Sequence, residues 1–181
     1  MSRLIAFLFV FASLPGWADK FAKGDPKVGD QPEPVLFALK QVHPQNEKLV
    51  TAIKNGESPP PGYQVVRMVL KNPDGKPVGE TPIVLNRKNI ITEKFVKFAE
   101  PNPGEPGTVM VQLAKKGGKR LERATEKMQL GQDRMAIVFK DRCLCAPVVQ
   151  SVLSTHFLIQ GLDGKKEVNE VIKALTAKDQ K

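Results

Sequence analysis

The sequence has few of the residues that carry thiol, metal or aromatic chemistry. Its 181 residues include two Cys, two His, one Trp and one Tyr. Two cysteines are too few for a disulfide framework, and the sequence has no clustered Cys/His pattern of the kind that binds zinc. Beyond Leu14, no apolar run approaches the roughly 20 residues that a membrane-spanning helix needs. These absences argue against a disulfide miniprotein, a zinc protein and a membrane transporter.

Basic residues are in excess over acidic residues. The sequence has 28 Lys and Arg against 19 Asp and Glu, which gives a formal net charge of +9. Hydrophobic residues make up 41% of the chain, enough for a packed core. The length favours one folded domain with tails.

The first residues follow the order of a secretory signal peptide. A positive start at Met1–Arg3 precedes the apolar run Leu4–Leu14, and small residues follow at Gly16 and Ala18, the −3 and −1 positions of a cut after Ala18. We therefore predict a signal peptide over residues 1–18, cleaved between Ala18 and Asp19. An uncleaved anchor is the alternative, but the run is short for a membrane span. No Cys lies near the cut, so we expect no lipid anchor there and a soluble periplasmic or secreted protein.

An exported basic protein encounters little nucleic acid outside the cytoplasm, so we expect no nucleic-acid partner. Other proteins, extended peptides and anionic surfaces such as lipid headgroups or acidic polymers are the partners that the charge favours. The lysines are spread along the chain, and a solvated surface explains that scatter as well as a binding patch does.

The remaining chain divides by composition and periodicity. We predict a flexible leader over 19–34, a strand and short helix over 35–58, a main domain over 59–177 and a tail over 178–181. Turn residues mark 72–75 and the tight turn at Asp141–Arg142. From Thr108 onward the expected order is β-α-β-β-β-α. The predicted fold class is α+β: a mostly antiparallel sheet with two or three helices packed on one face.

Several local predictions depend on glycine and spacing. Gly117–Gly118 is expected to open an amphipathic helix over 119–130, and Gly131 is expected to cap it. Residues 91–95 are expected to form one helical turn.

A series of short motifs in the second half of the chain resembles a known module. The motifs are Val109–Leu113, the Gly-led helix through Ala124–Thr125, Met135–Asp141, Cys145–Val149 and Ile159–Gly161. In order and spacing they resemble the head subdomain of the first periplasmic domain of SecD/SecDF, membrane subunits that help drive preproteins across the Sec translocon. The resemblance extends over roughly residues 60 to 176. It implies the head fold and a capacity to contact other polypeptides or the translocon.

The sequence also departs from the family pattern. Arg142 stands where the family usually has Gly, and Cys143 and Cys145 stand where Val and Ser are usual. The family's transmembrane helices are absent from this sequence, so we expect no proton-driven motor activity.

The two cysteines form a C-x-C pair at Cys143–Cys145. In an extended strand, residues i and i+2 point to the same face, so the two thiols are expected to be neighbours. A redox pair or half of a soft-metal site, with His156 as a further ligand, is one interpretation; two small buried residues are the other. His43 and His156 have no Ser or acid partner at catalytic spacing. We predict no catalytic site, no metal and no cofactor.

The predicted function is that of a non-enzymatic binding module. Pro147 within a strand places that strand near a sheet edge or at a bulge, and an edge can accept an extended peptide as an added strand. The predicted contact residues are Cys143, Cys145, Ala146, Pro147 and Val148, together with the loop 101–107. A cationic binder of acidic polymers or lipid headgroups is the first alternative, and a C-x-C thiol redox protein is the second.

Overall fold

The computed structural model describes residues 35–72 and 77–176. The predicted signal peptide, the cleavage site between Ala18 and Asp19, the leader 19–34, most of the turn at 72–75 and the tail 178–181 lie outside this part of the chain. The elements in chain order are β1 (Phe37–Gln41), α1 (Asn46–Lys54), β2 (Tyr63–Lys71), β3 (Pro77–Asn86), β4 (Ile91–Thr92), the 3-10 turn η1 (Glu93–Phe95), β5 (Val96–Pro101), β6 (Val109–Leu113), α2 (Lys115–Thr125), β7 (Met135–Phe139), β8 (Arg142–Cys145), β9 (His156–Ile159) and α3 (Gly164–Thr176).

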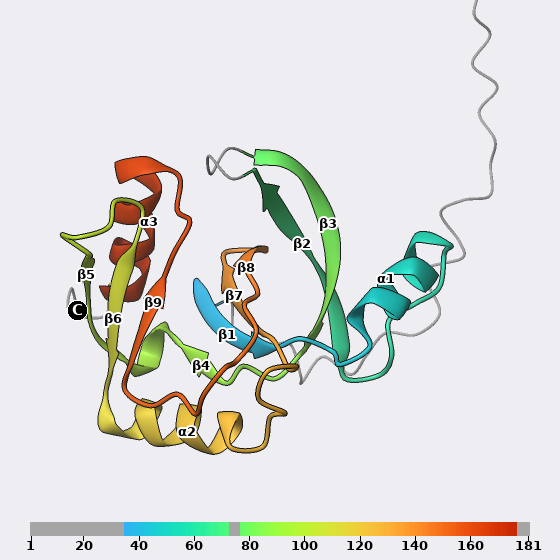
Figure 1. Ribbon diagram of the computed structural model, residues 1–181, viewed down its shortest axis with the longest axis horizontal. Helices are drawn as coiled ribbons and strands as arrows, with labels where there is room; N and C mark the ends of the chain where they lie inside the picture. The colour runs from blue at the N-terminus through green and yellow to red at the C-terminus, as the bar shows by residue number, and fades with distance from the viewer. Residues whose placement is uncertain (1–34, 73–76, 177–181) are drawn as a thin grey trace, which may run out of the picture. The chain divides into compact units, whose positions relative to one another are not determined.

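The strands form two sheets (Figure 1). Six strands pair in the order β3-β2-β8-β7-β1-β4, and three pair in the order β5-β6-β9. All strand pairs are antiparallel except β2 with β8. The order β-α-β-β-β-α from residue 108 is confirmed, as is the α+β class. The division into two sheets, with one parallel pair, was not predicted.

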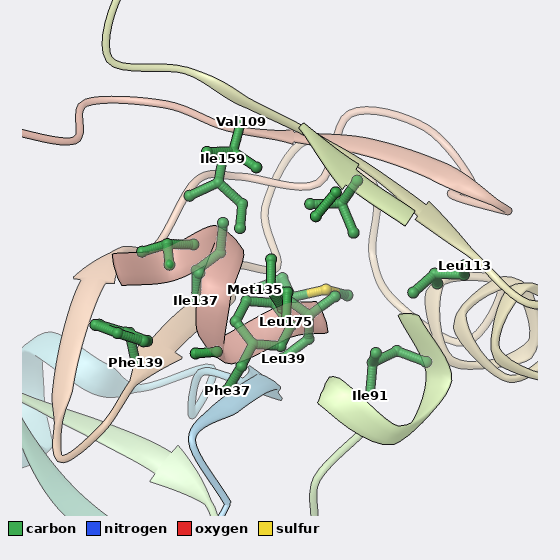
Figure 2. Close-up of a cluster of buried hydrophobic side chains, with 14 of the residues drawn as sticks. Phe37, Leu39, Ile91, Val109, Leu113, Met135, Ile137, Phe139, Ile159 and Leu175 are labelled. Carbon is green, nitrogen blue, oxygen red and sulfur yellow. The ribbon is translucent and has the colours of Figure 1, made fainter. Parts of the chain in front are cut away.

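Strand β7 is buried on both faces, which explains its unbroken apolar sequence. Met135, Ile137 and Phe139 belong to the larger buried cluster, which also holds residues of β1, β6, β9 and α3 (Figure 2). Ala136 and Val138 belong to a second cluster with residues of β3 and β8. Strand β1, from the predicted segment 35–58, pairs with β7 along its whole length, so this segment and the predicted main domain share one sheet.

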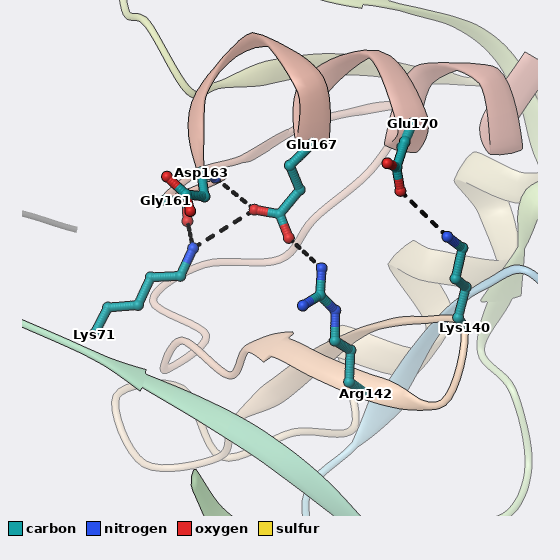
Figure 3. A network of polar contacts seen from close by, with 7 residues as sticks. All are labelled: Lys71, Lys140, Arg142, Gly161, Asp163, Glu167 and Glu170. Atoms are coloured by element: carbon teal, nitrogen blue, oxygen red, sulfur yellow. Dashed lines mark hydrogen bonds and ion pairs between the residues drawn. The ribbon is translucent and has the colours of Figure 1, made fainter. Parts of the chain in front are cut away.

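A polar network joins α3 to the six-stranded sheet (Figure 3). The Glu167 carboxylate, with 11% of its side chain exposed, accepts a bond from Arg142 of β8 and lies 3.7 Å from Lys71 Nζ of β2. At the exposed end of the network, Lys140 Nζ lies 3.2 Å from the Glu170 carboxylate. A carboxylate as buried as Glu167 needs such partners, because an unpaired buried charge is costly.

The prediction for α2 was wrong at both ends. The helix begins at Lys115 and ends at Thr125, so Gly117 and Gly118 lie inside it and Gly131 does not cap it. Close packing is the reason for the two glycines. A Cβ on Gly117 would lie 2.8 Å from Phe95 Cβ, and a Cβ on Gly118 would lie 2.5 Å from Thr155 Cγ2.

Two further local predictions are corrected. Residues 91–95 form the short strand β4 followed by a 3-10 turn rather than one helical turn. The tight turn between β7 and β8 consists of Lys140 and Asp141, because Phe139 pairs with Arg142. Lys140 takes the left-handed conformation, with φ of 54°, at the place where glycine would be least strained.

Candidate functional site: an open sheet edge

The outer edge of β3 (Pro77–Asn86) is closed to further pairing at residues 82–84. In β3, Pro82 pairs with Arg67 of β2. Because proline has no backbone N–H, residue 82 cannot donate a hydrogen bond to a further strand at the outer edge. Two residues along, both backbone groups of Val84 are bonded at the outer edge. Its N–H donates to Asn46 Oδ1 (2.9 Å) at the start of α1, and its carbonyl accepts from His43 N (2.8 Å). A proline and the start of a helix therefore cover this edge, which is how proteins commonly prevent edge-to-edge pairing.

The outer edge of β9 has none of these protections. The hydrogen bond from Leu113 N to Thr155 O (2.7 Å) fixes which residues face β6. Because bonded and non-bonded pairs alternate in an antiparallel ladder, His156 and Leu158 direct their backbone groups away from β6. No strand of the described residues pairs on that side. The sequence of β9 is His-Phe-Leu-Ile, without Pro, Gly, Lys or Glu.

The other two edges of the sheets are short or irregular. Strand β4 has only two residues. Strand β5 contains Lys97 and a register shift between Val96 and Phe98, and it packs against α3. Strand β9 is therefore longer than β4 and has neither the prolines of β3 nor the register shift of β5.

The outer face of the three-stranded sheet adds a shallow apolar surface next to this edge. Cross-strand pairing places Phe98, Gln112 and His156 in one row, and Glu100, Met110 and Leu158 in the next. Phe98 and Leu158 are 45% and 46% exposed. The side chains line a hollow of about 410 Å³. An extended peptide added to β9 would place alternate side chains along this hollow.

The loop 101–107, half of the predicted contact surface, lies at the end of the same sheet. It connects β5 to β6, and Gly107 O accepts from Leu162 N (3.0 Å) just beyond β9. Glu105 accepts from Gln160 Nε2 at 3.2 Å. The structure thus places this loop beside the end of β9.

The other half of the predicted surface, Cys143–Val149, does not form an edge. Strand β8 lies between β2 and β7, so the expected edge position was wrong, whereas the β7–β8 pair does contain a register shift of the kind expected at a bulge. Cys143 and Ala146 are buried, and Cys145 is half-buried. Pro147 follows the end of β8, where its missing N–H breaks no ladder bond, while its carbonyl accepts from Met135 N (3.0 Å). Contact through the exposed Pro147 and Val148 stays a prediction.

The two thiols do not share a face, contrary to expectation. A register shift in the β7–β8 pair sets Cys143 opposite Val138 and Cys145 opposite Ile137, which lie in different buried clusters. Burial raises the pKa of the Cys143 thiol to about 12 and also raises that of Cys145. Reactive thiols need the opposite shift, so this environment weighs against the redox alternative.

His156 does not join the cysteines. It lies in the three-stranded sheet, where Nδ1 is 3.0 Å from Thr155 Oγ1, whereas the cysteines lie in the six-stranded sheet. Within residues 35–72 and 77–176, no group of three or more His, Cys, Asp or Glu side chains could hold a metal ion. In the same ranges, no helix is both long and apolar enough to cross a membrane.

Sequence reasoning missed the β9 edge. It placed a strand at residues 156–160 but could not tell which strands pair on one side only. The available signal was the absence of Pro, Gly and charged residues from that strand.

Residues 35–72 and 77–176 form an α+β domain of two sheets and three helices. The chain belongs to the family described as SecDF, P1 head subdomain, whose sequence model matches residues 67–178, more than half of the chain. The resemblance noted from the motifs is confirmed. No protein with a curated description matches the chain.

Two solved structures share the fold. The first, described as "Structure and function of a membrane component SecDF that enhances protein export", is 18% identical with a TM-score of 0.51. The second, "Crystal structure of SecDF in Super-membrane-facing form", is 17% identical with a TM-score of 0.51. Both matches cover 78% of this chain, which spans 62% of the length of the first protein and 18% of the second.

Proposed function

We propose that this protein is an exported, non-enzymatic module that binds extended segments of other polypeptides by adding them as a strand to β9. The observation that carries the proposal is the unprotected outer edge of β9, beside an apolar hollow. Backbone hydrogen bonds supply affinity with little sequence preference in this mode of binding. Membership of a family whose solved member is described as enhancing protein export supports exported or unfolded chains as partners.

The predicted signal peptide supports a periplasmic or secreted location for this activity. The division of the chain after residues 18, 34, 58 and 177, which was predicted from the sequence, is likewise proposed. Strand addition does not depend mainly on charge, so binding should change little with ionic strength. The alternative, general binding of acidic polymers by a basic surface, predicts that added salt abolishes binding.

The test compares two exposed apolar residues, both on edge strands. Leu158→Asp places a charge on the open edge, whereas Val78→Asp makes the same change on β3, where Val78 is 65% exposed. For an unfolded polypeptide of zero net charge, we expect Leu158→Asp to weaken binding by about tenfold or more. Val78→Asp should change affinity by less than about twofold.

Fluorescence anisotropy at low and high salt measures both affinities, and circular dichroism confirms that each variant is folded. Equal affinities for the two variants, or wild-type binding that disappears with salt, would overturn the proposal.

A further inference from the structure

A second hollow, of about 520 Å³, lies between α2 and the loop that joins β3 to β4. Its lining carries four cations and no carboxylate: Lys88, Arg120, Arg123 and Lys127. Arg120, Arg123 and Lys127 follow one another at positions i, i+3 and i+7, so they project from the same side of α2 and the turn after it. We call this hollow the cationic pocket.

These four cations have no acidic partner among the described residues. Elsewhere in the described residues, five other cations pair with carboxylates: Arg67, Lys71, Arg134, Lys140 and Arg142. Unpaired like charges around one hollow repel one another, and a bound anion would relieve that repulsion.

One of the four cations is held in place before any ligand binds. Arg120 Nη2 donates to Asn89 O at 2.7 Å. The same guanidinium lies 5.4 Å from the centre of the Phe95 ring. An arginine fixed in this way loses less side-chain freedom on binding, and its planar fork suits two oxygens of a phosphate group.

A buried lysine holds the loop that lines the pocket, although it is not itself part of the lining. Lys40 is 5% exposed, and its Nζ donates to Arg87 O (2.7 Å) and Asn86 O (3.3 Å), in the loop that lines the pocket. Both partners are carbonyls, so the ammonium charge is not neutralised by a carboxylate among the described residues. Burial lowers the pKa of the Lys40 ammonium group.

The pocket also contains an unsatisfied acceptor. Asn89 lines the pocket, and its Oδ1 is buried without a hydrogen-bond partner among the described residues. Buried polar atoms of this kind are uncommon, because leaving one unpaired costs about 1–3 kcal/mol.

We propose that the cationic pocket binds a phosphate ester of headgroup size, with the phosphate held by Arg120, Arg123 and Lys127. The volume suits a small group, since ligand sites span about 300–1,000 Å³. A phospholipid headgroup and a free phosphate ester share this chemistry. The site is separate from β9, so either proposal can fail without the other.

The probe for the shared chemistry is glycerol phosphate, titrated into the full chain by calorimetry. The site variant Arg120→Gln/Arg123→Gln removes two charges, and the matched variant Lys48→Gln/Lys54→Gln removes two from exposed positions on α1. We expect the site variant to weaken binding by about tenfold or more, and the α1 variant by less than about twofold. If the Arg120 substitution disturbs folding, Arg123→Gln/Lys127→Gln, which leaves Arg120 in place, gives the same comparison.

Vesicles of phosphatidylglycerol and of phosphatidylcholine distinguish a lipid headgroup from a free phosphate ester as the source of the phosphate. The first 34 residues are the same in every variant, so a difference in vesicle binding between variants cannot come from them. Glycerol phosphate binding together with loss of phosphatidylglycerol binding in the site variant assigns a lipid headgroup. Glycerol phosphate binding without any vesicle difference assigns a free ester. Equal losses in both double variants, no binding of glycerol phosphate, or binding of polyglutamate alone would overturn the proposal.

Discussion

The two edge strands β3 and β9 differ in whether the backbone groups at their outer edges are covered. On β3, Pro82 lacks the N–H and α1 bonds to Val84, so a further strand finds no continuous ladder. On β9, His156 and Leu158 present their backbone groups without a covering element among the described residues. Edge protection is the rule in stable proteins, and under the proposed function the unprotected edge of β9 is the one that a partner strand joins.

The largest effect is expected where packing holds β9 in position. In Gly118→Val the new side chain collides with Thr155, the residue before β9, so we expect a loss of about 1–3 kcal/mol in the free energy of unfolding. Gly79→Val on β3 is the matched control, because no atom lies within 4 Å of a Cβ there. Urea denaturation measures both variants, and equal stability would show that the packing of α2 does not constrain β9.

Removing the protection from β3 should make the two edges alike. In Asn46→Ala/Pro82→Val, the Val84 N–H loses its acceptor and residue 82 gains an N–H. We expect self-association to strengthen by about tenfold relative to the wild type, equivalent to roughly 1.4 kcal/mol. Sedimentation velocity over a concentration series measures this change. Pro103→Val, which adds an N–H in a loop, is the control; an unchanged monomer fraction in the double variant would contradict the account of β3.

A smaller effect is expected from the ion pairs that join α3 to the six-stranded sheet. Glu167→Gln removes a mostly buried charge with partners on β2 and β8, and we expect a loss of about 1 kcal/mol in the free energy of unfolding. Glu170→Gln removes the exposed partner of Lys140 and should cost less than about 0.5 kcal/mol. Thermal unfolding of both variants separates the two values. Equal losses would indicate that the burial of Glu167 contributes nothing.

The sequence was sufficient to predict the local elements and their order, because hydrophobic alternation and helical periodicity are local signals. It was not sufficient to predict sheet pairing, which depends on contacts between distant segments. The strand predicted over residues 143–149 was therefore placed near an edge or at a bulge because of Pro147, although β2, from far earlier in the chain, pairs with β8 in parallel. The register shift that separates the two thiols, and the close packing that requires Gly117 and Gly118, depend on neighbours from other segments in the same way.

The most direct test of the central claim is a map of backbone amides on binding. The full chain, labelled with ¹⁵N, is titrated with the uncharged unfolded polypeptide at low and at high salt. The account predicts that the amides of His156 and Leu158 shift and gain protection from hydrogen exchange at both salt concentrations, while those of β3 do not change. Unchanged β9 amides, or shifts that vanish with salt, would contradict it.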